Sequence, residues 1–319
     1  MNSLGYFFTG PFIYIAVVLF LVLTIYKIRG YQQMPRHLRW DLYPIPHLGS
    51  EGSKYQKVDF HTKAPVFSKV DEGKYLGQEM LFIKKAFVNN RKLWVGSWPL
   101  HMGIYLGACW LVLLVFSAVM EFCGIAVGTA SAVSFGWIVK QMTIVVGVVG
   151  FSAGILGTLI LIWMRHTDEE LRYMADFVTY INLYLMLMVF GSGFIAWFTV
   201  DPSFDIIRQH VGGLLTFNGA SVNSLPIIFE MMAFGLFLCY LPFSRMMHFA
   251  AKYFFYHHIM WDDEAMKPGS QLEQDVNSYL KYQLTWEASH ISSSGSWVDQ
   301  VAAAKSAEGG KQDEKKNSH

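Results

Sequence analysis

The chain is poor in charged residues and in cysteine. Only 15% of its 319 residues are charged, while 53% are hydrophobic and 16% are aromatic. A soluble domain of this length cannot bury so large an apolar fraction. The composition therefore excludes an ordinary soluble protein and predicts an all-α integral membrane protein. The net charge of +1 gives no indication of a nucleic-acid partner, and none is expected.

Several cofactor motifs are also missing. The three cysteines, Cys109, Cys123 and Cys239, fall in or beside apolar segments and form no CxxC pair. An iron–sulfur cluster held by this chain alone is therefore not expected, and covalent c-type haem would need a CxxCH motif. No Walker-type or GxGxxG loop opens a helix. The first ten residues contain no basic stretch and no cleavage site follows, so we expect the first helix to be retained.

Long apolar runs are what the sequence does contain. A helix needs about 20 apolar residues to cross the hydrocarbon core of a bilayer, and five runs are of this kind. We predict transmembrane helices over 11–26, 100–122, 135–164, 175–200 and 225–249.

The basic residues are distributed unevenly between the connections. The segment 27–97 holds thirteen of them, counted along the sequence, whereas 123–134 has none. The loop 201–224 has only Arg208, against Asp201 and Asp205. Since basic connections stay inside, we expect the N-terminus outside and the C-terminus in the cytoplasm.

Two cytoplasmic segments show signs of order. Leu76, Met80, Ile83 and Phe87 recur at helical spacing among lysines, which predicts an amphipathic helix on the inner membrane face or a docking site for a partner. The segment after residue 250 contains three tryptophans, which favours a docking surface: Trp261, Trp286 and Trp297. The residues from 301 onward are small and charged, and disorder is expected there.

Two histidines are predicted to lie at the same depth. His101 falls in the first turn of the second span, and His248 falls where the fifth span returns to the same side. Two imidazoles at one depth could ligate the iron of a b-type haem, and Arg245 is placed to meet a haem propionate. Interfacial histidines without a special role remain the alternative. His166 ends the third span near the same level, and His210 in the outer loop is a weaker candidate for a quinone contact.

A glycine stripe marks the third span. Gly147, Gly150, Gly154 and Gly157 share one helical face. Such a face permits either close helix packing or the approach of a porphyrin edge.

The chain resembles a known family over about residues 1–300. The five spans, SWPLH at the second span and LFLCYLPFSRMMH at the fifth resemble the gamma subunit of respiratory nitrate reductase, a membrane cytochrome b. LTFNGAS and RHTDEELRYMAD add to this similarity. RWDLYPIPH and TWEASHI resemble the DsrM and TmcC branch, whose members exchange electrons between menaquinone and a cytoplasmic iron–sulfur protein related to heterodisulfide reductase.

The resemblance implies one haem rather than two. The ligands of the family's inner haem match His101 and His248, while those of its outer haem match Leu111 and Glu230, and neither residue is a histidine. A continuous helix would place Glu230 about 27 Å from His248 on the same face. We therefore expect one haem b, with a second only if other ligands complete it. Glu230 lies either in a quinone site as a proton-transfer group or near the outer water boundary. At that boundary the free-energy cost of placing an ionisable residue in a span is smaller.

Together these features predict a multi-pass cytochrome b of a bacterial or archaeal cytoplasmic membrane. It would link menaquinone to a cytoplasmic iron–sulfur subunit, with a periplasmic multihaem cytochrome c and other membrane subunits as further candidate partners. The alternative is a cofactor-free membrane anchor for a cytoplasmic enzyme. The expected divisions are a first helix (1–26), a docking segment (27–97), a haem-binding four-helix core (98–250), a second docking segment (251–300) and a tail (301–319).

Overall fold

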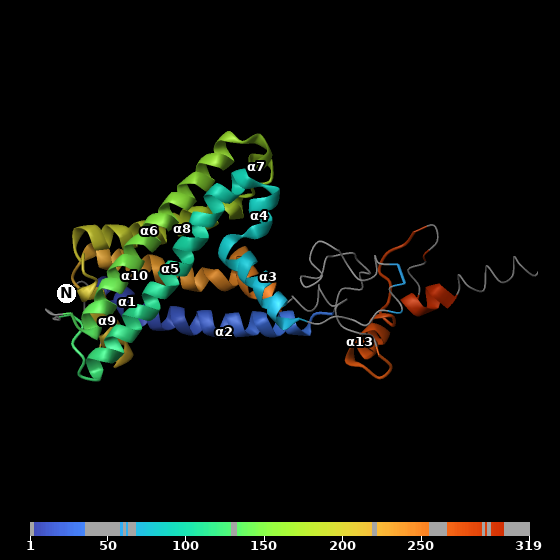
Figure 1. Ribbon diagram of the computed structural model, residues 1–319, viewed down its shortest axis with the longest axis horizontal. Helices are drawn as coiled ribbons and strands as arrows, with labels where there is room; N and C mark the ends of the chain where they lie inside the picture. The colour runs from blue at the N-terminus through green and yellow to red at the C-terminus, as the bar shows by residue number, and fades with distance from the viewer. Residues whose placement is uncertain are drawn as a thin grey trace, which may run out of the picture. The chain divides into compact units, whose positions relative to one another are not determined.

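The computed structural model is helical where it is described, and five of its helical segments are long and apolar enough to cross a membrane (Figure 1). This confirms the predicted fold class. The structure describes residues 3–35, 58–59, 62, 68–128, 133–218, 222–254, 267–288, 291 and 295–302. The predicted tail from residue 303 onward and Trp261 lie outside these ranges.

The third and fourth spans lie within three residues of their predicted bounds, whereas the first two are longer than predicted and the fifth is shorter. The first consists of α1 (Ser3–Thr9) and α2 (Pro11–Gln33), which together form one apolar segment. The second and third are α5 (Arg91–Phe122) and α6 (Phe135–Thr167). The fourth and fifth are α8 (Phe177–Thr199) and α10 (Leu225–Tyr240), the last continued to Phe243 by a 3₁₀ turn.

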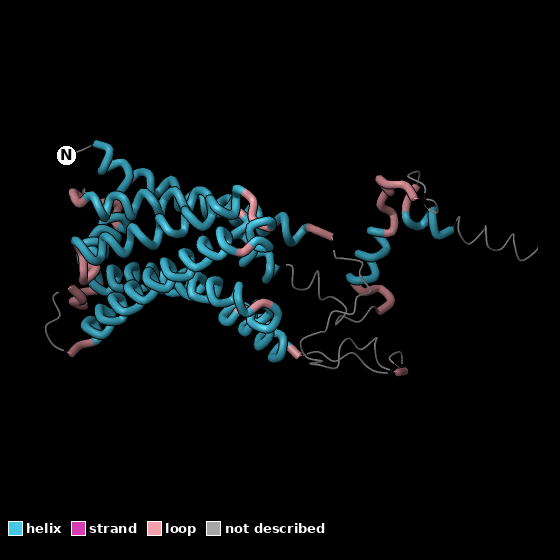
Figure 2. The backbone as a smooth tube through the Cα atoms, turned by 90° about the horizontal axis from the view of Figure 1, so that it is seen from above, coloured by secondary structure: helices cyan, strands magenta, loops and turns pink. Residues whose placement is uncertain are grey.

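Shorter helices lie at the two ends of the membrane unit. α9 (Asp205–Leu215) lies at the end that carries the N-terminus and the α5–α6 turn. α3 (Lys69–Phe82), α4 (Lys84–Asn89) and α7 (Glu169–Tyr173) lie at the opposite end (Figure 1). Figure 2 shows that the loops of this unit are confined to the ends of its helices. The two ends are therefore chemically separate regions joined by apolar helices.

The glycine stripe of α6 is filled by neighbouring helices. A Cβ atom on Gly157 would lie 2.2 Å from the backbone nitrogen of Leu100, and one on Gly103 would lie 2.5 Å from the Cα atom of Gly154. A Cβ atom on Gly154 would meet the ring of Phe190 of α8 at 2.4 Å. The stripe thus allows close backbone packing of α5 on α6, and its face is occupied by protein atoms rather than open to a porphyrin.

The fifth span does not continue as one α-helix to His248. α10 ends at Tyr240 and is followed by two 3₁₀ turns, η4 (Leu241–Phe243) and η5 (Arg245–Met247), before α11 (His248–Phe254). Pro242 has no N–H to continue the α-helical pattern, and Ser244 is extended with φ −90° and ψ 164°. The predicted common helical face of Glu230 and His248 was therefore wrong.

A second compact unit comprises 29–72 and 250–319, whereas 1–28 and 73–249 form the membrane unit. The described part of the second unit contains α13 (Gln271–Tyr279) and two isolated antiparallel bridges, Gln283 with Ser296 and Ala288 with Ile291. The rings of Trp286 and Trp297 meet edge to face at 6.1 Å. These two tryptophans thus contact each other within the described part of the second unit, and their predicted docking role stays a prediction.

Candidate functional site

The structure brings His101 and His248 together. Their ring centres lie 6.1 Å apart at an interplanar angle of 68°. His101 comes from the first third of α5, and His248 is the first residue of α11, directly after the two 3₁₀ turns. His248 is exposed and His101 is partly buried. The two imidazoles therefore share one depth, as predicted, and are direct neighbours.

Backbone carbonyls orient both rings. Nδ1 of His101 lies 2.7 Å from the carbonyl oxygen of Ser97, and Nδ1 of His248 lies 3.1 Å from that of Arg245. A carbonyl oxygen can only accept a hydrogen bond, so each Nδ1 carries the hydrogen. In the neutral rings each Nε2 then holds the lone pair, which is the state a metal ligand needs.

The pair is close enough for both imidazoles to hold one metal ion. Two metal–imidazole bonds of about 2 Å, with the distance from each nitrogen to its ring centre, add up to roughly 6 Å between ring centres. α5 packs mainly on α6 and α9, whereas α10 packs on α8 and α1. α6 packs on α8 and joins these two groups of helices.

Arg245 is ion-paired at this end of the bundle. Its Nη2 donates to Oδ2 of Asp176, the N-cap residue of α8. A hydrogen bond from Thr179 and the bond from Arg245 together hold the pKa of Asp176 below its usual range. Both side chains are exposed, and the guanidinium has further N–H groups that could meet a propionate. Sequence reasoning placed Arg245 correctly beside His248 but missed Asp176, which lies 69 residues away in the chain.

Three aromatic side chains of α5 hold the end of α3. Trp94 and Trp98 donate their indole N–H groups to the carbonyls of Phe82 and Leu81, at 2.8 and 3.2 Å. The hydroxyl of Tyr105 donates to the carbonyl of Met80 at 2.6 Å. These are the last three carbonyls of α3, which have no donor within the helix.

These donors share a helical face with His101. Trp94, Trp98, His101 and Tyr105 are spaced four, three and four residues apart, which places them along one side of α5. The spacing was visible in the sequence, but their partner was not. The end of α3 is therefore fixed beside the turn that carries His101.

Glu230 lies in the second turn of α10, at the opposite end from the histidine pair, and is partly buried. Among the described residues it has no hydrogen bond or ion pair. Its carboxyl group is close enough to that of Asp201 for the two to interact electrostatically. Asp201 is 4% exposed and accepts a hydrogen bond from the backbone N–H of Ile207 at 2.9 Å.

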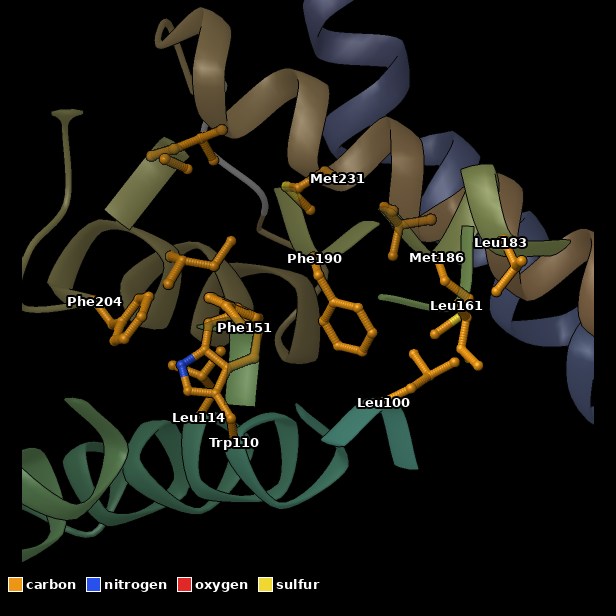
Figure 3. Packing of buried hydrophobic residues seen from close by; sticks show 14 residues of the cluster. Leu100, Trp110, Leu114, Phe151, Leu161, Leu183, Met186, Phe190, Phe204 and Met231 are labelled. Carbon is orange, nitrogen blue, oxygen red and sulfur yellow. The ribbon is translucent and has the colours of Figure 1, made fainter. Parts of the chain in front are cut away.

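Aromatic rings fill the interior beside Leu111. The neighbouring Trp110 meets Phe151 at 5.0 Å and Phe204 at 5.1 Å between ring centres, and the rings converge between α5, α6 and α9 (Figure 3). All three side chains are 5% exposed or less. The interior beside Leu111 is therefore occupied by aromatic side chains.

An ion network closes the same end. Arg208 of α9 is only 4% exposed in its side chain and contacts Asp205 at 2.5 Å and Glu121 of α5 at 3.3 Å. Lys140 of α6 contacts Asp205 at 2.9 Å and donates to the carbonyl of Gly128. Burial alone would raise the pKa of Asp205, but the bonds from Lys140 and Arg208 hold it below its usual value. The network ties three helices together.

His210 lines a pocket of about 90 Å³ near the break between α1 and α2. It is buried, and its Nε2 lies 2.7 Å from the carbonyl of Thr9. Pro11 has no N–H to donate, and the N–H of Ile13 donates to the carbonyl of Gly10. The helix break therefore leaves the carbonyl of Thr9 for the imidazole. The hydroxyl of Tyr14 donates to the carbonyl of Leu214 at 2.6 Å across the same pocket. A structural bond thus explains the burial of His210.

The remaining histidines do not add to the site. His166 donates from Nδ1 to the carbonyl of Ile162 and meets the ring of Tyr180 edge to face. Within the described ranges, no group of three or more His, Cys, Asp or Glu side chains could hold a metal ion. Six further histidines, predicted as surface or docking residues, lie outside those ranges: His37, His47, His61, His257, His258 and His290.

Comparison with known proteins adds no relative. No family model, curated protein or solved structure matches this chain.

Proposed function

We propose that the protein is a membrane cytochrome b subunit that passes electrons between menaquinone and a cytoplasmic iron–sulfur subunit. The observation that carries the proposal is the pair of imidazoles with ring centres 6.1 Å apart at one end of a five-span membrane protein. His101 and His248 would hold one haem b, which supplies reversible one-electron transfer when bound. Both rings already have their Nδ1 hydrogens committed to backbone carbonyls.

Each nearby residue has a defined part in this function. Ser97 and Arg245 fix the tautomers of the two ligands through their carbonyls, which removes the need to reorient either ring on binding. Asp176 holds the guanidinium of Arg245 at the same end, where it would meet a propionate. The exposed position of His248 suits exchange of electrons with a partner at that surface.

Quinone chemistry is proposed at the opposite end. Quinol oxidation releases two protons with its two electrons, so a proton acceptor is required. Glu230 is a carboxyl group within a span, without a described hydrogen-bond partner and near Asp201, and it is our candidate for this role. His210 is the second candidate because it lines a pocket at the same end.

The decisive experiment is a pyridine haemochrome titration of the purified chain. We expect one b haem per polypeptide and its loss in both His101→Ala and His248→Ala. His166→Ala is the matched control, since it removes an imidazole from the same end without touching the pair. Absence of haem from the unaltered chain would return the protein to the class of cofactor-free membrane anchors, and two haems would require ligands outside the pair.

The quinone site is tested separately by quinol-dependent reduction of the haem. We expect Glu230→Gln to impair turnover while the haem spectrum is unchanged. His210→Gln is the comparison variant. Loss of turnover in His210→Gln alone would move the quinone to the pocket beside Thr9, and normal turnover in Glu230→Gln would remove that residue from the mechanism.

A further inference from the structure

The segment between α3 and α5 combines exposed apolar side chains with a cluster of basic residues. We name residues 80–92, which comprise the end of α3, all of α4 and the first two residues of α5, the elbow. We infer that the elbow lies in the bilayer surface at the histidine end and binds anionic phospholipid headgroups.

Hydrogen bonds to α5 set the depth of the elbow. The carbonyls at its start accept from Trp94, Trp98 and Tyr105, and the long apolar run of α5 begins between these donors, at Leu100. Residues 94 and 105 are about 16 Å apart along the helix axis. Tryptophan and tyrosine are enriched where membrane helices leave the hydrocarbon core. The elbow is thus fixed at the boundary between headgroups and acyl chains.

The side chains of the elbow divide into two kinds. Leu81, Phe82 and Val88 are each more than half exposed in the described structure. Such residues at the edge of a membrane span are covered by acyl chains when they lie in the interface. The left-handed backbone of Ile83, with φ 48° and ψ 50°, makes the sharp turn that separates α3 from α4.

The charged side chains of the elbow are all basic, and one of them, Lys92, is ion-paired with Asp168. No acidic residue occurs between Glu79 and Glu121. Lys84 bonds to the neutral amide of Gln78, and Arg91 lies over the ring of Phe87 at 4.2 Å, so neither of these contacts neutralises the cation. Positive side chains at this depth match the phosphate groups of anionic lipids. Charge and depth together favour a lipid surface over a protein partner.

Spin labels measure the depth of the elbow. In a chain with its three native cysteines replaced by alanine and reconstituted in phosphatidylcholine–phosphatidylglycerol nanodiscs, we expect a label at Phe82→Cys or Val88→Cys to collide more with oxygen than with a water-soluble nickel chelate. A label at Asn89→Cys, next to Val88 but polar, should show the reverse. Nickel access at all three positions would place the elbow in water, leave it free for a protein partner and overturn the inference.

Headgroup binding is tested by lipid retention. Phosphatidylglycerol that remains bound after detergent extraction is counted by mass spectrometry. We expect Lys84→Gln and Arg91→Gln each to weaken retention about fivefold. Lys27→Gln is the matched control. Lys27 is an exposed cation in the last third of α2, and it lies outside the elbow. Equal retention in the elbow variants and the control would overturn the role of these charges. Neither measurement requires haem.

Discussion

The two ends of the membrane unit are held together by different interactions. At the end that carries Arg208, a buried guanidinium, two carboxylates and a lysine join α5, α6 and α9, above a dense aromatic cluster. At the end that carries His101 and His248, the ion pairs are exposed and the contacts are mainly hydrogen bonds to backbone carbonyls. The first arrangement is largely buried, and the second leaves His248 exposed. A site that must accept a cofactor and a partner belongs at the less tightly closed end.

The largest effect on stability is expected at Arg208. Replacing Arg208 with Met leaves Asp205 and Glu121 without their shared cation, and we expect a loss of about 3–5 kcal/mol in the free energy of unfolding. Arg172→Met removes an exposed pair with Glu169 and should cost less than about 1 kcal/mol. Unfolding in mixed micelles measures both. Equal effects would mean that the two ends are not held differently.

The packing between the ends gives the next largest effect. Gly157→Ala would place a Cβ atom 2.2 Å from the backbone of Leu100, and overpacking of this kind costs about 1–3 kcal/mol. Gly191 of α8 has nothing within 4 Å of its Cβ position, so Gly191→Ala should be neutral or stabilise by up to about 1 kcal/mol. The same unfolding assay compares them. A tolerated Gly157→Ala would contradict the close contact of α5 and α6.

A smaller effect is expected where α3 meets α5. Trp98→Phe keeps an aromatic ring but removes the donor to the carbonyl of Leu81, which should cost about 1 kcal/mol. We expect faster proteolysis of α3 and little change in the global unfolding midpoint. Trp163→Phe, on the exposed face of α6, is the control. If α3 is cleaved at the same rate in both variants, the bond does not hold it.

The last effect depends on pH and concerns Asp205. Its pKa is lower in the folded protein than its ordinary value of 3.8, so the ionised carboxylate stabilises the fold above that pH. The stabilisation is lost as the pH falls through the folded pKa. Asp205→Asn should therefore flatten the loss of stability in acid, as measured by the unfolding midpoint against pH. Asp176→Asn, at the exposed pair with Arg245, should change this profile less. An unchanged profile in Asp205→Asn would show that other groups control acid unfolding.

Much of the architecture could be predicted from the sequence. The lengths of the apolar runs specify five spans. The runs also place His101 and His248 at the same end, because the second apolar run begins near His101 and the fifth ends near His248. The spacing of Trp94, Trp98 and Tyr105 was visible as a helical stripe, although its partner was not. Pro242, which has no N–H to donate, is a local signal in the sequence for the break after α10.

The sequence by itself determined the membrane class, the number of spans and the depth of the histidine pair, since hydrophobicity and helical rise are properties of each segment alone. Only the tertiary structure decided that the two imidazoles are neighbours, that Asp176 holds Arg245, that aromatic rings fill the interior beside Leu111 and that α3 is bonded to α5. These contacts join residues from separate helices. Their geometry depends on how the helices pack, which no single segment encodes.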